Sequence, residues 1–308
     1  MAKAKGAPIK RNGFVPFAYL SPALLTIAIF SLFPMLYTVY LSFTNFNLNH
    51  FDQFQYVGFD NYKEILAGPF FDIFFPVFIW TVIYALCATG FSYIAGLVLA
   101  LLLNNERMKE TNIYRGILII PWAIPAAIAI LAWQGLWNDS FGQINTLLSA
   151  IGLPKIPWLT DPFWARAAIT ITTVWLGYPF MMNVCLGALQ AIPKDLYESA
   201  EIDGATRWKR FRYVTLPGLM SSTLPLLISS FAFNFNNFGA AYLITAGGPP
   251  GETQYAGHTD LLATAAYNLT MTSNRYDLAA TLSFIIFIIV GTLSFINMKA
   301  TKAFEEVD

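Results

Sequence analysis

Charged residues are scarce in this 308-residue sequence, where they make up 12% of the chain. A soluble domain carries about twice that fraction, roughly 25%. Hydrophobic residues make up 56%, and they gather into runs about 20 residues long, the length of helix that crosses a bilayer core of roughly 30 Å. The formal net charge is zero, so the composition indicates no nucleic-acid partner. It predicts a polytopic, all-α membrane protein.

Groups that commonly bind metals or cofactors are also few. The two cysteines, Cys87 and Cys185, lie inside apolar runs and are typical of small buried hydrophobic residues. The two histidines, His50 and His258, stand alone, so no Cys/His spacing predicts a metal site. The phosphate-binding pattern G-x-x-x-x-G-K-[S/T] is absent, and the chain is not expected to bind ATP in that way. We expect no cofactor and no catalytic residues.

Six apolar segments are long enough to be membrane spans. They cover residues 14–43, 77–103, 116–137, 166–190, 218–244 and 278–298. The first is too long for the hydrophobic region of a cleaved signal peptide, which has roughly 7–15 residues. Pro34 is expected to kink the first span, and Pro121 and Pro125 to break the third, because a proline inside a helix removes a backbone hydrogen bond.

The basic residues predict how these spans are oriented. With the N-terminus inside, fourteen of the eighteen Lys and Arg residues face the cytoplasm. A transmembrane domain over residues 14–300 then stands between cytoplasmic ends at 1–13 and 301–308. The polar stretch from Tyr197 to Pro217, called the platform below, is cytoplasmic, and the segment 191–217 is the loop that contains it. The outer loops are residues 44–76, 138–165 and 246–277.

Acidic and basic residues are missing from the middle of every expected span. Proton-coupled transporters usually place such residues mid-membrane, where they bind the proton, so their absence argues against proton coupling. Sodium coupling through carbonyl and hydroxyl groups stays open. No selectivity-filter pattern indicates a channel. If transport is active, we expect its energy to enter from another subunit, and the platform is the place where that subunit would act.

The platform is the most polar run in the chain. Pro193 suits the first turn of a helix, and Lys194 to Asp203 predicts a short amphipathic helix that carries four acids. Gly204 can adopt the left-handed conformation that ends this helix, and Thr206 can cap a second, basic helix. An alternative is a basic juxtamembrane helix that binds the headgroups of anionic lipids. That alternative explains the arginines but not the glycine-hinged pair of helices.

Three asparagines, Asn234, Asn236 and Asn237, lie inside the fifth expected span. Amides in a span cost free energy unless neighbours, water or a polar ligand satisfy them. Asn234 and Asn237 share a predicted helical face with Ser230, whereas Asn236 points elsewhere and is expected to be an interhelical strut. Hydrogen bonding between helices and binding of sugar hydroxyls are both open interpretations of this group.

Sugars also present apolar faces that pack on aromatic rings. Trp122 and Trp175 can supply such rings, and Gly177 permits a close approach of the backbone. The alternative for the two tryptophans is ordinary packing between spans or anchoring at the membrane interface.

The platform carries a spaced pattern that resembles the cytoplasmic signature of the permease subunits of bacterial ABC importers. The signature is Glu-Ala-Ala, three residues, Gly, nine residues, Ile, one residue and Leu-Pro, and here only Ser199 and Val214 depart from it. The resemblance implies a type I importer fold, in which this helix pair is the coupling helix that sits in a groove of an ATPase subunit. The residues implied to couple are Glu198, Ala200, Asp203, Gly204, Leu216 and Pro217.

Further segments narrow the resemblance. The runs WLGYPFMM, IPKDLYE, FAFNFNNF, ITAGGP and AGHTDLL are similar to the larger permease of maltose/maltodextrin importers, the MalF type, without its extra N-terminal spans and large periplasmic insertion. The residues implied to contact sugar are Trp122, Ala126, Trp175, Leu176, Gly177, Ser230, Asn234 and Asn237. Three positions differ from the family: Trp122 replaces a tyrosine, Ala126 replaces a serine and Thr173 replaces an asparagine. The expected cargo is maltodextrin, maltose or a related sugar such as trehalose.

The resemblance also implies partners and a mechanism. The chain is expected to form half of the pathway of an ATP-driven sugar importer in the bacterial inner membrane and to work by alternating access. The implied partners are a second permease of the same fold, two ATPase subunits and an extracytoplasmic sugar-binding protein that meets the three outer loops. Membrane lipid surrounds the spans. Two alternatives come from other classes: a proton- or sodium-coupled secondary sugar transporter, and a lipid-binding scaffold that transports nothing.

Overall fold

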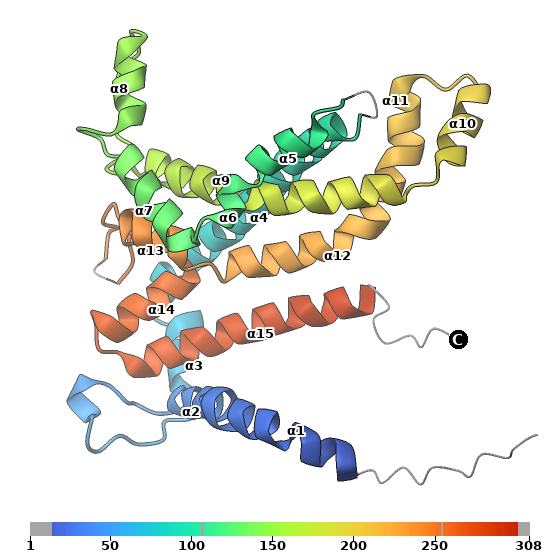
Figure 1. Ribbon diagram of the computed structural model, residues 1–308. Helices are drawn as coiled ribbons and strands as arrows, with labels where there is room; N and C mark the ends of the chain where they lie inside the picture. The colour runs from blue at the N-terminus through green and yellow to red at the C-terminus, as the bar shows by residue number, and fades with distance from the viewer. Residues whose placement is uncertain (1–13, 106–107, 254, 301–308) are drawn as a thin grey trace, which may run out of the picture.

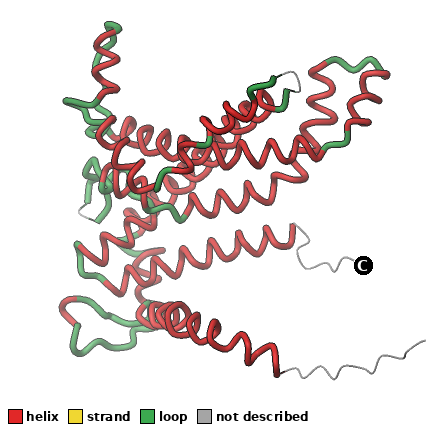
Figure 2. Tube along the Cα trace, viewed as in Figure 1, coloured by secondary structure: helices red, strands yellow, loops and turns green. Residues whose placement is uncertain are grey.

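The computed structural model describes residues 14–105, 108–253 and 255–300. The expected cytoplasmic ends, 1–13 and 301–308, lie outside these residues. Within the described chain, regular structure is helical apart from two isolated β-bridges, as Figure 1 and Figure 2 show. The all-α fold expected from the composition is therefore confirmed.

The helices follow one another in this order. The described residues begin with α1 (Phe14–Ile27), a π turn (Ala28–Leu32) and α2 (Phe33–Leu41), and the loop that follows holds a 3₁₀ turn (Leu48–His50). Next come α3 (Asp60–Leu66), α4 (Phe71–Leu103), α5 (Thr111–Leu118), α6 (Ile120–Ala123), α7 (Ala126–Leu136), α8 (Gln143–Ala150) and α9 (Pro162–Ala191). The last part holds α10 (Lys194–Ile202), α11 (Arg207–Arg210), a second π turn (Phe211–Thr215), α12 (Leu216–Phe235), α13 (Gly239–Thr245), α14 (Leu262–Met271) and α15 (Tyr276–Ala300).

Five helical segments of the described chain are long and apolar enough to cross a membrane. They are Tyr19–Leu41, Phe71–Leu103, Pro162–Ala191, Arg207–Thr245 and Tyr276–Lys299. These segments overlap five of the six expected spans. The remaining one, expected over residues 116–137, consists of the end of α5 with α6 and α7, and none of these helices reaches the length of a span by itself.

Proline explains why that segment is divided. Ile124, which precedes Pro125, has φ −82° and ψ 136°, an extended conformation. The ring of a proline crowds the residue before it and disfavours the helical conformation there. α7 begins directly after Pro125, so the break lies where the sequence places it.

Proline also affects the first span. Pro34 is the second residue of α2, and the π turn Ala28–Leu32 joins α1 to α2 directly before it. The helix therefore continues past Pro34, where a kink was expected, by means of a wider helical turn. None of the described residues of α2 is buried, so the first span depends on the residues that follow α2 for attachment to the rest of the chain.

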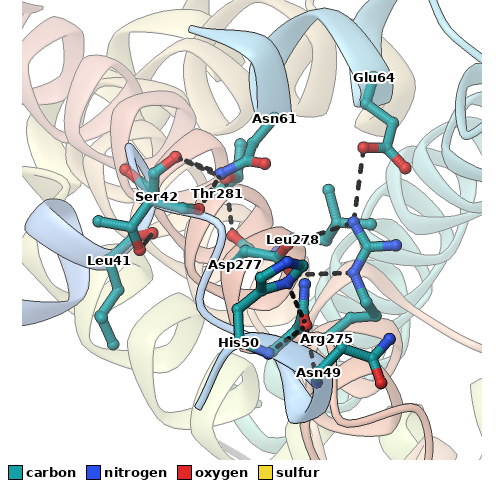
Figure 3. A network of polar contacts seen from close by, with 12 residues as sticks. Leu41, Ser42, Asn49, His50, Asn61, Glu64, Arg275, Asp277, Leu278 and Thr281 are labelled. Atoms are coloured by element: carbon teal, nitrogen blue, oxygen red, sulfur yellow. Dashed lines mark hydrogen bonds and ion pairs between the residues drawn. The ribbon is translucent and has the colours of Figure 1, made fainter. Parts of the chain in front are cut away.

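That attachment is a polar network at the start of α15, drawn in Figure 3. Arg275 donates to the carboxylate of Asp277 at 2.9 Å and lies 3.5 Å from that of Glu64 in α3. Asn61 of α3 donates to the carbonyl oxygen of Ser42, which follows α2, at 2.9 Å. Asp277 is 2% exposed, and a buried carboxylate requires such a partner because an isolated charge is costly to bury. The network fixes α2 and α3 to the start of α15.

The centre of the bundle is the pair α4 and α9, against which α12 packs. A Cβ atom at Gly96 of α4 would lie 2.6 Å from the backbone nitrogen of Met182 in α9. A Cβ atom at Gly177 of α9 would lie 2.8 Å from Ser92 Oγ in α4. Glycines at these points let the two helices approach closely, which is the usual device for helix contact in membranes.

The connections lie at two opposite ends of the bundle, as Figure 1 shows. The start of α1, the start of α5, the pair α10 and α11 and the end of α15 lie at one end. The loop after α2, helix α8 and the connections around α14 lie at the other end. This separation matches the two groups of loops that the basic residues distinguish.

Candidate functional site

A cavity of about 910 Å³ lies between α4, α6, α7, α9, α12, α13 and α15. Its lining runs from Thr89 of α4 to Val290 of α15, so its walls bring together segments that are far apart in the chain. Seven of the eight residues implied to contact sugar line it: Trp122, Ala126, Leu176, Gly177, Ser230, Asn234 and Asn237. Thr173, which stands where the family has asparagine, lines it too.

The eighth residue, Trp175, is not among those that line the cavity. Its ring packs edge-on against Trp133 of α7, with ring centroids 5.5 Å apart. Trp122 is 59% exposed and lines the cavity from α6. Of the two rings that the sequence offers, Trp122 is available to a ligand, whereas Trp175 takes the packing role that was its alternative.

The asparagines are arranged differently from the expected single helical face. α12 ends at Phe235, so Asn236 and Asn237 belong to the short connection before α13. The Oδ1 atom of Asn237 accepts the backbone N–H of Ala240 at 3.3 Å, which satisfies a free donor at the start of α13. The cavity is thus lined by a helix end and a connection rather than by one continuous helix.

Asn234 makes the contact that was expected of Asn236. The side chain of Asn234 is 9% exposed and donates from Nδ2 to Thr89 Oγ1 of α4 at 3.0 Å. Asn236 is exposed, lines the cavity and makes no side-chain hydrogen bond to another described residue. Asn234 therefore joins two helices while it lines the cavity, so the two open interpretations of this group are compatible.

The polar lining consists of hydroxyl and amide groups. No Asp, Glu, Lys or Arg is among the lining residues of the described chain. Three polar lining residues were not predicted from the sequence: Thr89, Ser92 and Ser229. Their only signal in the sequence is a small polar residue in an apolar run, which is too common to single them out. Hydroxyls and amides both donate and accept, so the cavity suits an uncharged ligand that is rich in hydroxyl groups.

The platform folds as the sequence predicts. α10 ends at Ile202, and Gly204 has φ +71°, in the left-handed region. The N–H of Gly204 donates to Glu201 O at 3.0 Å, and that of Ala205 donates to Ala200 O at 2.9 Å. This pair of bonds is a Schellman motif, which ends helices at a left-handed residue.

The second helix of the platform starts at the predicted cap. The Oγ1 atom of Thr206 accepts the backbone N–H of Lys209 at 3.4 Å. α11 then continues through the π turn Phe211–Thr215 into α12. Two contacts hold the platform helices together: an ion pair of 3.0 Å between Arg210 and Glu201, and a hydrogen bond of 3.0 Å between Tyr197 and Thr215.

The platform also exposes large apolar side chains. Ile202 is 87% exposed and Trp208 is 70% exposed, and Leu196 is exposed beside them. Glu198 is exposed and makes no ion pair with another described residue. Exposed large apolar side chains beside a cluster of charged residues are typical of a contact site for a partner. The amphipathic pattern of α10 indicates these residues in the sequence, although only the acids were singled out.

Comparison with known proteins shows a family match and similar transport proteins. Residues 92–300 match the family model described as binding-protein-dependent transport system inner membrane component. The galactooligosaccharides transport system permease protein GanP of Bacillus subtilis is 38% identical over 296 residues, which cover 94% of this chain and 71% of GanP. The maltodextrin transport system permease protein MdxF of the same organism is 39% identical over 310 residues, which cover 96% of this chain and 71% of MdxF.

A solved structure shares the fold. It is a chain of a bacterial ABC transporter involved in the import of the acidic polysaccharide alginate. The TM-score is 0.76 at 25% sequence identity, and the match covers 94% of this chain and 96% of that chain.

Proposed function

The chain belongs to the binding-protein-dependent transport system inner membrane components, and we propose that it carries a neutral oligosaccharide of the maltodextrin or galactooligosaccharide class as the permease subunit of an ABC importer. The observation that carries the proposal is the cavity, whose lining residues bear hydroxyls, amides and the exposed ring of Trp122 but no charge. The hydroxyl groups of a sugar can form hydrogen bonds with these hydroxyls and amides, and its apolar face can pack on the ring of Trp122.

The absence of charged side chains from the cavity lining favours a neutral cargo over an acidic one. A polysaccharide that carries carboxylates needs basic partners when it leaves water, because an unpaired charge is expensive to bury. The structural relative is a transporter of the acidic polysaccharide alginate. The cavity described here contributes no basic side chain, which supports a neutral cargo for this chain.

The transport cycle that we propose is alternating access across six spans, the third of them made of α5, α6 and α7. This chain supplies half of the pathway, and a second permease of the same fold supplies the other half. The ends at 1–13 and 301–308 face the cytoplasm, as the distribution of Lys and Arg favours.

The platform is the proposed entry point of energy from ATP. Glu198, Leu196 and Ile202 of α10 are exposed. A groove in an ATPase subunit could therefore contact the two apolar side chains and the carboxylate of Glu198. Two such subunits would act, one on each permease. The coupling residues are those that the family signature implies: Glu198, Ala200, Asp203, Gly204, Leu216 and Pro217.

The opposite end of the bundle would receive an extracytoplasmic sugar-binding protein. Helix α8 projects away from the bundle there (Figure 1). The proposed contact surface consists of the outer loops over residues 44–76, 138–165 and 246–277.

The main experiment is reconstitution of the complete transporter in liposomes with its binding protein. We expect maltodextrins or galactooligosaccharides to stimulate ATP hydrolysis and sugar uptake to require ATP. Uptake that continues without ATP but collapses with the proton gradient would instead establish secondary transport.

Two variants test the parts of the proposal. Glu198→Lys should abolish sugar-stimulated hydrolysis and leave membrane insertion intact, whereas the control Glu110→Lys, an exposed acid outside the platform, should behave like wild type. Asn234→Ala combined with Asn237→Ala should abolish uptake, with the exposed Asn112→Ala as the control. Unchanged uptake in the double variant is the result that a lipid-binding scaffold predicts.

A further inference from the structure

Ser92 of α4 is a buried residue whose hydroxyl makes no hydrogen bond to another described residue. The residue is 4% exposed and lines the cavity. Hydroxyls in a helix normally donate to the carbonyl four residues earlier, as Thr81 does to Val77 O at 2.7 Å and Thr173 to Ile169 O at 2.9 Å. Ser92 makes no such bond among the described residues, and its Oγ is not enclosed by protein atoms. Its one free direction is the cavity.

The level of Ser92 in the cavity follows from the hydrogen bond between Asn234 and Thr89. This bond, of 3.0 Å, sets α12 beside α4, and the two helices run in opposite directions along the bundle (Figure 1). Ser92 is three residues after Thr89, and Ser230 is four residues before Asn234. Each step is about one helical turn on the same face, roughly 4.5 Å along the axis for three residues and 6 Å for four. Both steps lead toward the platform end, so Ser92 and Ser230 lie at about the same level.

Gly177 completes this level from α9. A Cβ atom there would lie 2.8 Å from Ser92 Oγ, so any larger residue would cover the hydroxyl. Ser230 lines the cavity and, like Ser92, makes no hydrogen bond to another described residue. The two serine hydroxyls are therefore both available to a ligand on the platform side of the Asn234–Thr89 bond.

We propose that Ser92 binds sugar and that, with Ser230, it forms an inner subsite one helical turn beyond Asn234. The inference rests on the proposed function, because its ligand is a hydroxyl of the transported oligosaccharide. A serine hydroxyl donates and accepts at once, as a sugar hydroxyl does. Gly177 keeps the subsite open, and Ser92 brings α4 into a site that the family resemblance confines to α6, α7, α9, α12 and the connection after it.

The experiment measures sugar binding to the purified membrane complex without its binding protein, which would otherwise set the apparent affinity. Maltotriose and a galactotriose are titrated, and the melting temperature of the complex reports binding because a ligand of the folded state stabilises it. Ser92→Ala should weaken binding of the preferred sugar about 3- to 10-fold, the effect of one lost hydrogen bond to an uncharged partner. Ser221→Ala is the matched control, because its hydroxyl donates to Gly218 O at 2.9 Å and lies outside the cavity.

A combined variant separates binding from packing. Gly177→Ala crowds Ser92 Oγ and should lower both the melting temperature without sugar and the affinity for sugar. Adding Ser92→Ala removes the crowded atom and should restore the melting temperature but not the affinity. Recovery of both quantities would show that Ser92 acts only in packing and would overturn the inference, as would equal affinities of wild type and Ser92→Ala. If wild type binds neither sugar, the proposed function fails along with the inference.

Discussion

Substitution of Gly204 tests whether the shape of the platform matters for coupling. Gly204 has φ +71°, and a Cβ atom added there would meet no atom within 4 Å. Alanine therefore introduces no clash, and its only cost is the left-handed backbone, about 1–2 kcal/mol. If coupling requires this conformation, the competent population falls by about 5- to 30-fold, since 1.4 kcal/mol corresponds to a factor of ten.

A graded series makes this prediction sharper. Asn is tolerated in the left-handed region and should cost less than alanine, whereas valine is β-branched and should cost more. Gly204→Pro should be the most damaging, because proline fixes φ near −65°. The assay is sugar-stimulated ATP hydrolysis by the reconstituted transporter, together with recovery of the ATPase subunit on the purified membrane complex.

The control is Gly187→Ala in α9. Its added Cβ atom also meets nothing within 4 Å, but its backbone is helical, so alanine should change stability only by the gain in helix propensity, up to about 1 kcal/mol. Hydrolysis should remain at the wild-type level in this control. Full activity of Gly204→Val in the same assay would refute the reasoning, because a β-branched residue that strongly disfavours the left-handed backbone would then leave coupling intact.

Three further outcomes are expected. Gly96→Ala should lower the unfolding free energy by about 1–3 kcal/mol in thermal denaturation, because its Cβ atom would lie 2.6 Å from the backbone of α9, whereas Gly90→Ala on the same helix, which meets nothing within 4 Å, should not. Trp122→Ala should weaken sugar binding, while Trp175→Phe should lower the melting temperature and leave sugar affinity unchanged; the reverse pattern would contradict the assignment of the two rings. Burial raises the pKa of Asp260 in the outer loop, and its hydrogen bonds lower the pKa by less. The folded state then binds this proton more tightly than the unfolded state, so the free energy of unfolding increases as the pH falls from 7 toward the pKa of the unfolded state, about 3.9. Asp260→Asn should flatten that part of the plot of melting temperature against pH.

The platform could be predicted from the sequence because its structure is determined locally. A proline before the helix, Gly204 after it and Thr206 before the next each act within a few residues. The observed Schellman bonds and the Thr206 cap depend on no distant contact. The break at Pro125 is local for the same reason, since the proline constrains the residue beside it.

The cavity could be predicted only in part, because tertiary contacts decide it. α12 ends at Phe235 without a proline or glycine at positions 236–238. Asparagine can end a helix, but Asn236 and Asn237 lie in an otherwise apolar run, so a continuous helix was the natural expectation. Asn234 finds its partner, Thr89, 145 residues away in the sequence. Which tryptophan faces the cavity likewise depends on where Trp133 packs. Hydrophobic periodicity predicts on which face of its own helix a residue lies, but it does not predict which residue of a neighbouring helix contacts that face.

The two π turns show how a local rule and the proposed mechanism meet. In each case a proline follows two residues after the turn: Pro34 after Ala28–Leu32, and Pro217 after Phe211–Thr215. A proline ring clashes with the carbonyl four residues earlier, and that residue, Phe30 or Tyr213, is the middle one of the turn. The wider turn accommodates the ring while the helix continues.

This accommodation matters most at Pro217, because the platform and the cavity share one helical path. The segment from Arg207 through α12 remains helical up to Phe235, and Ser230 and Asn234 lie near its far end. A break at Pro217 would let the platform move without displacing these residues. If energy enters at the platform, as proposed, a helix that continues through a π turn would transmit a push on α11 along its axis to the cavity wall. The Leu216–Pro217 pair of the family signature directly follows the π turn, so in the proposed cycle it would lie where the helix passes the push from the platform to α12.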